Sequence, residues 1–416
     1  MISFTRHRLD NGLTLIHHHD TTTRMVAVNI LYRVGSCNER APLTGLAHLL
    51  EHLMFTGSQH VANYDHELQA AGGESNAWTS VDSTNYYDIL PAQNLETALW
   101  LESDRLQGLT LGAEAIATQR SVVIEEFKQR CLNAPYGDVS HLVNSMVYTT
   151  HPYQWPPIGR KIEDIEAATA DDVRQFHRDH YAVNNAILCI SGNVPLDRAL
   201  KAVNHWFGDI EPHQLALQCE VNEPQQTQGR MRQVSRDVPQ TLICRAYRMP
   251  ARADALFPAC DILSDVLSNG KSARFYQNVM LQSQLFTELD ASVAGTLCDG
   301  LFYVRARLAD GADITRAQAV IDHELQHLLA DGISDYELEK FVNKHIATDR
   351  FENLGYSQQA MRLCLYEQIG DTNLIYSEEA IYRNLTTQDI MQAASSILRP
   401  NNCSTLIYNA RNASLA

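Results

Sequence analysis

An internal repeat is the feature of this sequence that most restricts its fold. The segment DDVRQFHRDHYAVNNAILCISGN has a helical pattern, an Asn-Asn pair and then an apolar strand, and QDIMQAASSILRPNNCSTLIYN repeats that order. The offset from Asn185 to Asn402 is 217 residues, and the Tyr-Arg pairs that end at Arg33 and Arg248 are 215 residues apart. Two similar offsets at opposite ends of the halves predict two homologous domains of about 200 residues, far longer than solenoid units.

The domain boundary is expected near the middle of the chain. Pro, Gln and Gly accumulate and hydrophobic periodicity fades in PHQLALQCEVNEPQQTQGRMRQ. We predict an N-terminal domain over 1–211, a linker over 212–228 and a C-terminal domain over 229–416. Alternating strands such as VAVNILYR are mixed with helical patterns such as NLETALWLESDRLQGL. The expected fold is α+β, with two homologous domains that are each a mainly antiparallel sheet with helices packed on one face.

Composition narrows the class of protein. The 416 residues are 45% hydrophobic and carry a formal net charge of −16. The hydrophobic share is ample for buried cores, whereas phosphate-backbone binding relies on clustered Lys and Arg. The chain has no long apolar run, and its first residues have no stretch typical of a signal peptide. We expect a soluble protein that binds neither nucleic acid nor membrane, cytoplasmic, or periplasmic if a signal was removed.

Two pentapeptides have the spacing of metalloprotease zinc motifs. The first is His48-Leu-Leu-Glu51-His52, in the inverted H-x-x-E-H order, and the second is His323-Glu324-Leu-Gln-His327, in the H-E-x-x-H order. In each, the two His are four residues apart, about 40° around a helix, so both imidazoles can reach one ion. The pentapeptides alone do not decide between the two sites.

The surroundings favour the first pentapeptide. Its helix is apolar on nearly every side, with a cap expected at Thr44 or Asn38 and an end at Gly57. Such a helix is buried, and burying two His and a Glu without partners is costly. A bound cation would satisfy all three side chains.

The second pentapeptide lies on a helix with a single apolar stripe, and its His and Glu are expected on the solvated face. A zinc site there would need a distant third ligand such as Glu337 or Glu339. We keep it as the less favoured alternative.

A third zinc ligand is expected from a carboxylate in an apolar setting. In ATQRSVVIEEFKQR, Glu126 shares a helical stripe with Val122 and Val123, whereas Glu125 points about 100° away from Glu126. A catalytic zinc usually has three protein ligands and leaves the fourth position to water. Glu126 is therefore the better candidate.

These motifs together resemble one known family. H-L-L-E-H, then GGESNAWTSVDSTNYY at 72–87, QRSVVIEEF and HPYQWPPIG at 151–159 occur in the order of the inverted-zincin M16 metallopeptidases. The resemblance covers essentially the whole chain. It implies a zinc-dependent endopeptidase acting on peptides or unfolded segments, with one zinc per chain bound by His48, His52 and Glu126 and with Glu51 as general base.

The resemblance also implies a substrate site. Ser75, Asn76, Ala77, Trp78 and Thr79 look like the edge strand on which a substrate peptide lies, and such an edge binds main chain with little sequence preference. We add Phe55, which closes the motif helix, to the predicted substrate-binding residues.

The chain departs from the family pattern at three positions. Gln119 stands where the family commonly has a Glu that supports the zinc ligands. Gln can form hydrogen bonds with those ligands but does not supply the negative charge of a Glu. Met280 and Thr287 stand where the C-terminal domain usually carries an Arg and a Tyr that close on the substrate. The second half also lacks an H-x-x-E-H at the repeat-equivalent position, so we expect it to be noncatalytic.

These departures bear on the oligomeric state of the protein and on whether it is an enzyme or a noncatalytic subunit. We expect either a homodimer or a heterodimer with a zinc-less M16-like chain that supplies the Arg and Tyr. The alternative function is a noncatalytic M16-like structural or partner subunit, although the intact His48, Glu51, His52 and Glu126 argue against it.

Overall fold

The structure, a computed structural model, describes residues 3–215 and 221–411. The chain forms two compact units, and they do not follow the two halves of the sequence throughout. Unit 1 contains the described residues of 1–130, 151–221 and 351–376, and unit 2 contains those of 131–150, 222–350 and 377–416. Residues 216–220 of the predicted linker lie outside the described residues.

Unit 1 is built on a six-stranded sheet in the order β1-β2-β6-β3-β5-β4, antiparallel except where β2 pairs with β6. Its strands are β1 (Thr5–Arg8), β2 (Thr14–His19), β3 (Met25–Tyr32), β4 (Glu74–Thr79), β5 (Thr84–Pro91) and β6 (Ala186–Gly192). Its helices are α1 (Leu46–Leu53), α2 (Tyr64–Ala70), α3 (Leu95–Gln107), α4 (Ala113–Phe127), α6 (Ile162–Ala167), α7 (Ala170–His180), α8 (Leu196–Phe207) and α12 (Tyr356–Gln368). β4 is an edge strand.

Unit 2 repeats this plan with five strands in the order β7-β11-β8-β10-β9. Its strands are β7 (Arg230–Arg236), β8 (Leu242–Met249), β9 (Phe286–Ala294), β10 (Gly300–Leu308) and β11 (Cys403–Ala410). Its helices are α5 (Val139–Val147), α9 (Phe257–Ser268), α10 (Ile314–Asp331) and α14 (Thr387–Ile397), while α11 (Asp335–Glu352) and α13 (Leu374–Arg383) lead into and out of segment 351–376. Strand β7 pairs in parallel with β11, as β2 does with β6.

Each half of the chain contributes a helix to the sheet of the other half. Helix α12, from the second half, packs on β3 and β6 of unit 1, and α5, from the first half, packs on the equivalent strands β8 and β11 of unit 2. The two helices begin at Val139 and Tyr356, again 217 residues apart. The exchange is therefore part of the repeat itself.

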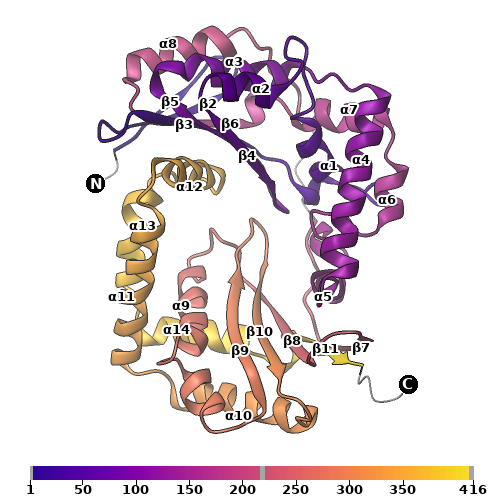
Figure 1. Ribbon diagram of the computed structural model, residues 1–416. Helices are drawn as coiled ribbons and strands as arrows, with labels where there is room; N and C mark the ends of the chain where they lie inside the picture. Colours follow the sequence, from indigo (N-terminus) through magenta and orange to yellow (C-terminus); the bar gives the residue numbers. More distant parts are fainter. Residues whose placement is uncertain (1–2, 216–220, 412–416) are drawn as a thin grey trace. The chain divides into compact units, whose positions relative to one another are not determined.

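The exchanged helices explain why the central strands are apolar on both faces. In β3, Ala27 and Leu31 belong to the core cluster formed with Leu363 of α12, while the alternating Val28 and Ile30 face the opposite side and are also fully buried. Figure 1 shows α12 on the side of this sheet opposite to α3 and α8. The predicted α+β fold with mainly antiparallel sheets is confirmed, with one additional helix on the second face of each sheet.

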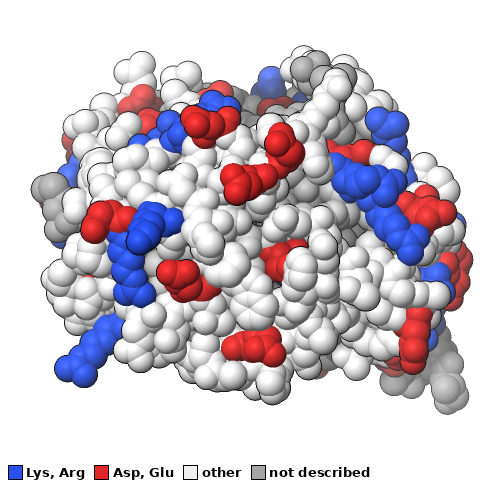
Figure 2. All heavy atoms as spheres, turned by 90° about the horizontal axis from the view of Figure 1, so that it is seen from above, with Lys and Arg blue, Asp and Glu red and all other residues white. Residues whose placement is uncertain are grey.

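Two further observations concern the helices and the distribution of surface charge. No helix among the described residues is long and apolar enough to span a membrane. On the face shown in Figure 2, basic and acidic side chains are interspersed over a surface made mostly of uncharged residues.

Candidate metal centre

Helix α1 is buried as the sequence predicts. Leu46, Ala47, Leu49, Leu50 and Leu53 are all buried, and the chain enters the helix at Gly45 with φ of +87°. A Cβ at Gly45 would lie 3.0 Å from the Ile158 carbonyl oxygen and 3.2 Å from Gly159 Cα, so both the backbone angle and the space require glycine. The HPYQWPPIG stretch therefore packs directly against the start of α1.

The predicted cap of this helix at Thr44 or Asn38 is wrong. The Thr44 hydroxyl donates to Asp164, and the Asn38 side chain accepts the Gly35 N–H. The helix start is held instead by buried Glu39, whose two carboxylate oxygens accept the N–H groups of Gly45 and Ala47 at 2.9 Å each.

Glu39 also accepts the indole N–H of Trp155 at 3.0 Å. Burial raises the pKa of Glu39 to about 8, and these three donors act in the opposite direction. A carboxylate at a helix N-terminus also interacts favourably with the helix dipole.

The three predicted ligands converge. The Nε2 atoms of His48 and His52 lie 3.6 and 3.4 Å from one oxygen of Glu126, and the three candidate ligand atoms all lie within 4.8 Å of one another. The imidazoles come from α1 and the carboxylate from α4, which packs beside it (Figure 1). The neighbouring Glu125 turns away and pairs with Lys128 at 2.7 Å.

The spacing and chemistry of this cluster fit a zinc ion. Atoms bound at about 2.0–2.2 Å to a tetrahedral zinc lie about 3.3–3.6 Å from one another, and two imidazoles with one carboxylate form a common catalytic ligand set. Burial lowers the pKa of His48 to about 4, which keeps its imidazole neutral, and the hydrogen bond with His52 lowers the pKa of Glu126. Arg130 holds the second Glu126 oxygen at 2.8 Å. In the described residues no other group of His, Cys, Asp and Glu has such spacing.

Glu51 lies on the same helix and is held by the edge strand. The hydroxyl of Thr79, the last residue of β4, donates to Oε2 of Glu51. Burial raises the pKa of Glu51, and the hydrogen bond from Thr79 acts against that rise. The candidate base is thus a largely enclosed carboxylate one helical turn from His48 and next to His52.

The predicted substrate residues lie on or near β4. Among the described residues β4 pairs with β5 alone, so its other edge has no strand partner there. The Ala77 N–H donates to the Asn76 side chain at 2.8 Å rather than to another strand. Ser75 contacts Asp65 of α2 at 3.3 Å, and Trp78 is half-buried. Phe55 is half-buried, with its ring 5.5 Å from that of Tyr64.

The second pentapeptide does not form a comparable cluster. His327 is half-exposed and pairs with Asp331 at 2.9 Å, which agrees with the expected solvated face. The expectation for Glu324 is wrong, because this residue is only 4% exposed and accepts hydrogen bonds from Asn278 at 3.0 and 3.2 Å. Glu337, the possible distant ligand, pairs with Arg274 at 2.8 Å.

The side chains at the three positions that depart from the family pattern, Gln119, Met280 and Thr287, have the following surroundings. Gln119 is half-buried on α4, and within the described chain its amide makes no hydrogen bond to the candidate ligands. The Thr287 hydroxyl donates to the Gln240 side chain at 2.8 Å. Met280 ends a π-helical segment and packs against the core of unit 2.

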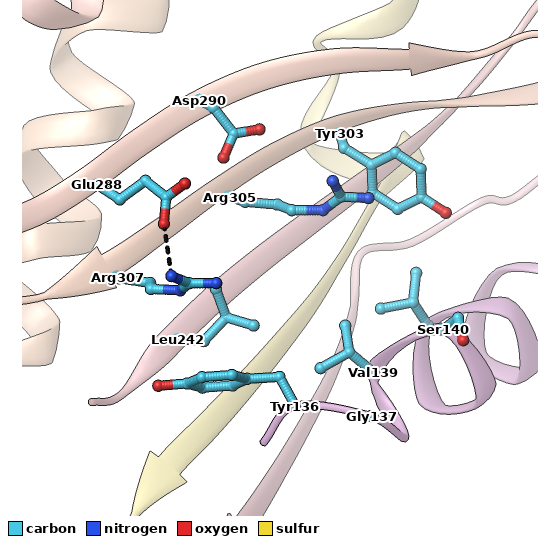
Figure 3. A pocket seen from close by; sticks show the side chains of 11 residues that line it. Tyr136, Gly137, Val139, Ser140, Leu242, Glu288, Asp290, Tyr303, Arg305 and Arg307 are labelled. Carbon is cyan, nitrogen blue, oxygen red and sulfur yellow. Dashed lines mark ion pairs between the residues drawn. The ribbon is translucent and has the colours of Figure 1, made fainter. Parts of the chain in front are cut away.

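A pocket of about 350 Å³ in unit 2 contains none of the candidate residues. It lies between β8, β9 and β10 and the start of α5, and Figure 3 shows Arg307 paired with Glu288 and Arg305 beside Tyr303. The Arg305 guanidinium lies 4.3 Å from the centre of the Tyr303 ring. Glu288, Arg305 and Arg307 are thus engaged with one another or with aromatic rings. The cluster of His48, His52 and Glu126 in unit 1 remains the candidate site.

Comparison with known families agrees with this geometry. A family model described as Insulinase (Peptidase family M16) matches residues 14–156, and one described as Peptidase M16 inactive domain matches residues 167–344. The chain belongs to the M16 peptidase family. The range matched by the first model includes His48, Glu51, His52 and Glu126. The name of the second model accords with the absence of an H-x-x-E-H from the equivalent stretch of the second half.

Similar M16 proteins match along most of the chain. It is 28% identical over 408 residues to Zinc protease PqqE of Helicobacter pylori, covering 96% of this chain and 91% of that protein. It is 25% identical over 337 residues to Uncharacterized zinc protease YmxG of Bacillus subtilis, covering 80% of each. The names of these relatives indicate a family of zinc peptidases.

Solved structures have the same fold. A protease from Helicobacter pylori matches with a TM-score of 0.92 at 26% identity, covering 98% of this chain and all 100% of that one. Pitrilysin matches with a TM-score of 0.83 at 18% identity, covering 99% of this chain and 45% of that one, which is a likeness of fold alone.

Proposed function

We propose that this chain is a zinc-dependent endopeptidase that hydrolyses peptides or unfolded segments of proteins. The observation that carries the proposal is the convergence of His48 and His52 with Glu126 in unit 1. Glu51 is enclosed beside this cluster and is tied to an unpaired sheet edge.

The ligand set defines the chemistry. A zinc ion held by His48, His52 and Glu126 would supply Lewis-acid polarisation of the scissile carbonyl and would lower the pKa of the attacking water. Glu51 accepts the water proton on Oε1, since Oε2 is engaged by Thr79, and then delivers that proton to the leaving amine nitrogen. Burial of α1 excludes bulk water from one side of this carboxylate.

The substrate is expected to add to β4 as an extra strand. Main-chain hydrogen bonds at the free edge hold an extended peptide whatever its side chains. The peptide would replace the Asn76 side chain as the partner of the Ala77 N–H. Most backbone N–H and C=O groups of a folded protein are already paired within its own structure, which is why we infer peptides or unfolded segments as the substrate class.

The proposal is tested with the purified full chain, an unstructured fluorogenic peptide and a measurement of bound metal. We expect one zinc per chain and cleavage by the wild type, and we expect Glu51→Gln to keep its zinc and lose cleavage. Zinc binding without cleavage of any unstructured peptide would instead support a noncatalytic M16-like subunit.

We further propose that the active species is a dimer, either of two copies or with a zinc-less M16-like chain. Its basis is the Met280 and Thr287 pair at positions where the resemblance implies Arg and Tyr. Sedimentation of the chain alone and in mixture with an encoded zinc-less relative tests this. Full activity of a monomer would contradict it.

A further inference from the structure

We propose that Thr79 is a positioning residue that fixes the Glu51 carboxylate relative to the substrate strand. This inference rests on the proposed peptidase function. Among the described residues, the Thr79 hydroxyl is the donor that hydrogen-bonds the Glu51 side chain, and it reaches Oε2 across 28 positions of sequence. A largely enclosed carboxylate held by one directional donor keeps one orientation and leaves its second oxygen for chemistry.

The backbone of Thr79 is itself fixed by the turn that follows it. Thr79 pairs with Thr84 at the end of the β4–β5 hairpin. The intervening turn is closed by the Ser80 N–H, which donates to the Ser83 carbonyl at 2.8 Å. The Ser80 hydroxyl oxygen accepts the N–H groups of Asp82 and Ser83 at 3.1 and 3.0 Å.

A second segment holds the same turn from outside. The carbonyls of Ser80 and Val81 accept the N–H groups of Ser36 and Cys37 at 3.2 and 2.9 Å. A Cβ at Gly35 would lie 2.5 Å from the Ser80 carbonyl oxygen and 2.6 Å from the Val81 carbonyl carbon, so this approach is possible only for glycine. The hydroxyl that meets Glu51 therefore belongs to a strand end held from both sides.

The consequence concerns catalytic geometry. The strand that would bind the substrate main chain through Ala77 ends two residues later in the group that orients the base. One rigid strand then sets both the position of the scissile bond and that of the carboxylate. A misplacement of about 1 Å in such an arrangement costs about 100-fold in rate.

The kinetic test compares Thr79→Val, Thr79→Ser and the control Thr56→Val. The control removes a hydroxyl that donates to the Leu53 carbonyl near the end of α1 and does not touch Glu51. We expect Thr79→Val to lower kcat by about 10- to 100-fold with unchanged KM and zinc content, and Thr79→Ser to restore most of kcat. An unchanged kcat, a rise in KM alone, or equal loss in the Val and Ser variants would overturn the proposal.

Crystal structures test whether Thr79 orients the Glu51 carboxylate, independently of any activity measurement. In crystal structures of the zinc-loaded proteins, we expect a single Glu51 position against Thr79 in the wild type and a rotated or split carboxylate in Thr79→Val. If the wild type cleaves no peptide, the proposed function fails while this comparison still tests the positioning role. An identical Glu51 position in both proteins would rule that role out.

A variant away from the hydroxyl, Gly35→Ala, should have the same effect on kcat. Gly35→Ala should displace the turn after β4 and lower kcat in the same way with Thr79 in place. Unaltered kcat in a crystal-verified displaced turn would contradict the argument that the strand end sets the geometry.

Discussion

The indole nitrogen of Trp155 lies 3.0 Å from the carboxylate of Glu39, at the N-terminus of α1. This contact links the 151–159 stretch to the helix that carries both candidate zinc-binding His. The same carboxylate accepts the first backbone N–H groups of that helix.

Removing the Glu39 carboxylate should destabilise the N-terminus of α1, the helix that carries His48 and His52. In Glu39→Gln the amide NH₂ would face buried N–H donors, and an unpaired buried donor costs about 1–3 kcal/mol. We expect lower stability and weaker zinc binding, measured by urea unfolding and by competition with a chelator. Glu163→Gln, which changes an exposed carboxylate at the start of α6, is the matched control and should alter neither. Equal zinc affinity in the two variants would contradict this role.

Replacement of single His residues should separate the two zinc motifs. His48→Ala removes one of three converging ligands, whereas His323→Ala changes an exposed side chain on α10. We expect metal analysis to show zinc lost in the first variant and retained in the second. The reverse result would move the metal site to α10.

The sequence predicted those features that depend on local periodicity. The repeat, the buried α1 and the choice of Glu126 over Glu125 all follow from the spacing of residues on one element. The Glu39 cap, the Thr79–Glu51 bond and the burial of Glu324 depend on partners many residues away. A one-dimensional pattern does not contain those pairings.

The exchange of α5 and α12 was missed for another reason. Because both helices occupy equivalent places in the two repeats, swapping them leaves the 217-residue offset unchanged. The compact units therefore differ from the predicted ranges 1–211 and 229–416, and the spacing of the sequence repeat does not reveal this difference.

Acid should destabilise unit 1 through His177. This residue is buried on α7, and burial lowers its pKa to about 4 from an ordinary 6.5. Between these two pH values His177 binds more protons in the unfolded chain than in the folded one. Its contribution to the free energy of unfolding is therefore fully present above pH 6.5 and is lost as the pH falls to about 4. The loss amounts to about 3 kcal/mol.

Urea unfolding at pH 7 and pH 4.5 measures this effect. His177→Gln should show a smaller difference between the two pH values than the wild type. His205→Gln, at an exposed position of α8, serves as the control and should behave as the wild type does. Equal pH dependence in all three proteins would exclude His177 as the source.

The buried Arg105 should be important for the stability of unit 1. Its guanidinium hydrogen-bonds the fully buried Glu102 at 2.9 Å and lies 4.4 and 4.3 Å from the ring centres of Tyr64 and Tyr86. Removing one member of a buried ion pair leaves the other charge uncompensated, at a cost of about 3–5 kcal/mol. We expect that loss for Arg105→Met by chemical unfolding, and partial recovery when Glu102→Gln is added. A double variant no more stable than the single one would contradict the pairing argument.

The exchanged helix also determines when the first sheet can be completed during synthesis. Strand β6 is finished at Gly192, yet Leu363 of α12, which covers its apolar face, is made about 170 residues later. At about 5–20 residues per second, that interval is roughly 10 to 35 seconds. Throughout it, Ile16, Leu31 and Ile187 lack their partner helix, so the nascent chain exposes an apolar sheet face that chaperones or a neighbouring nascent chain could bind.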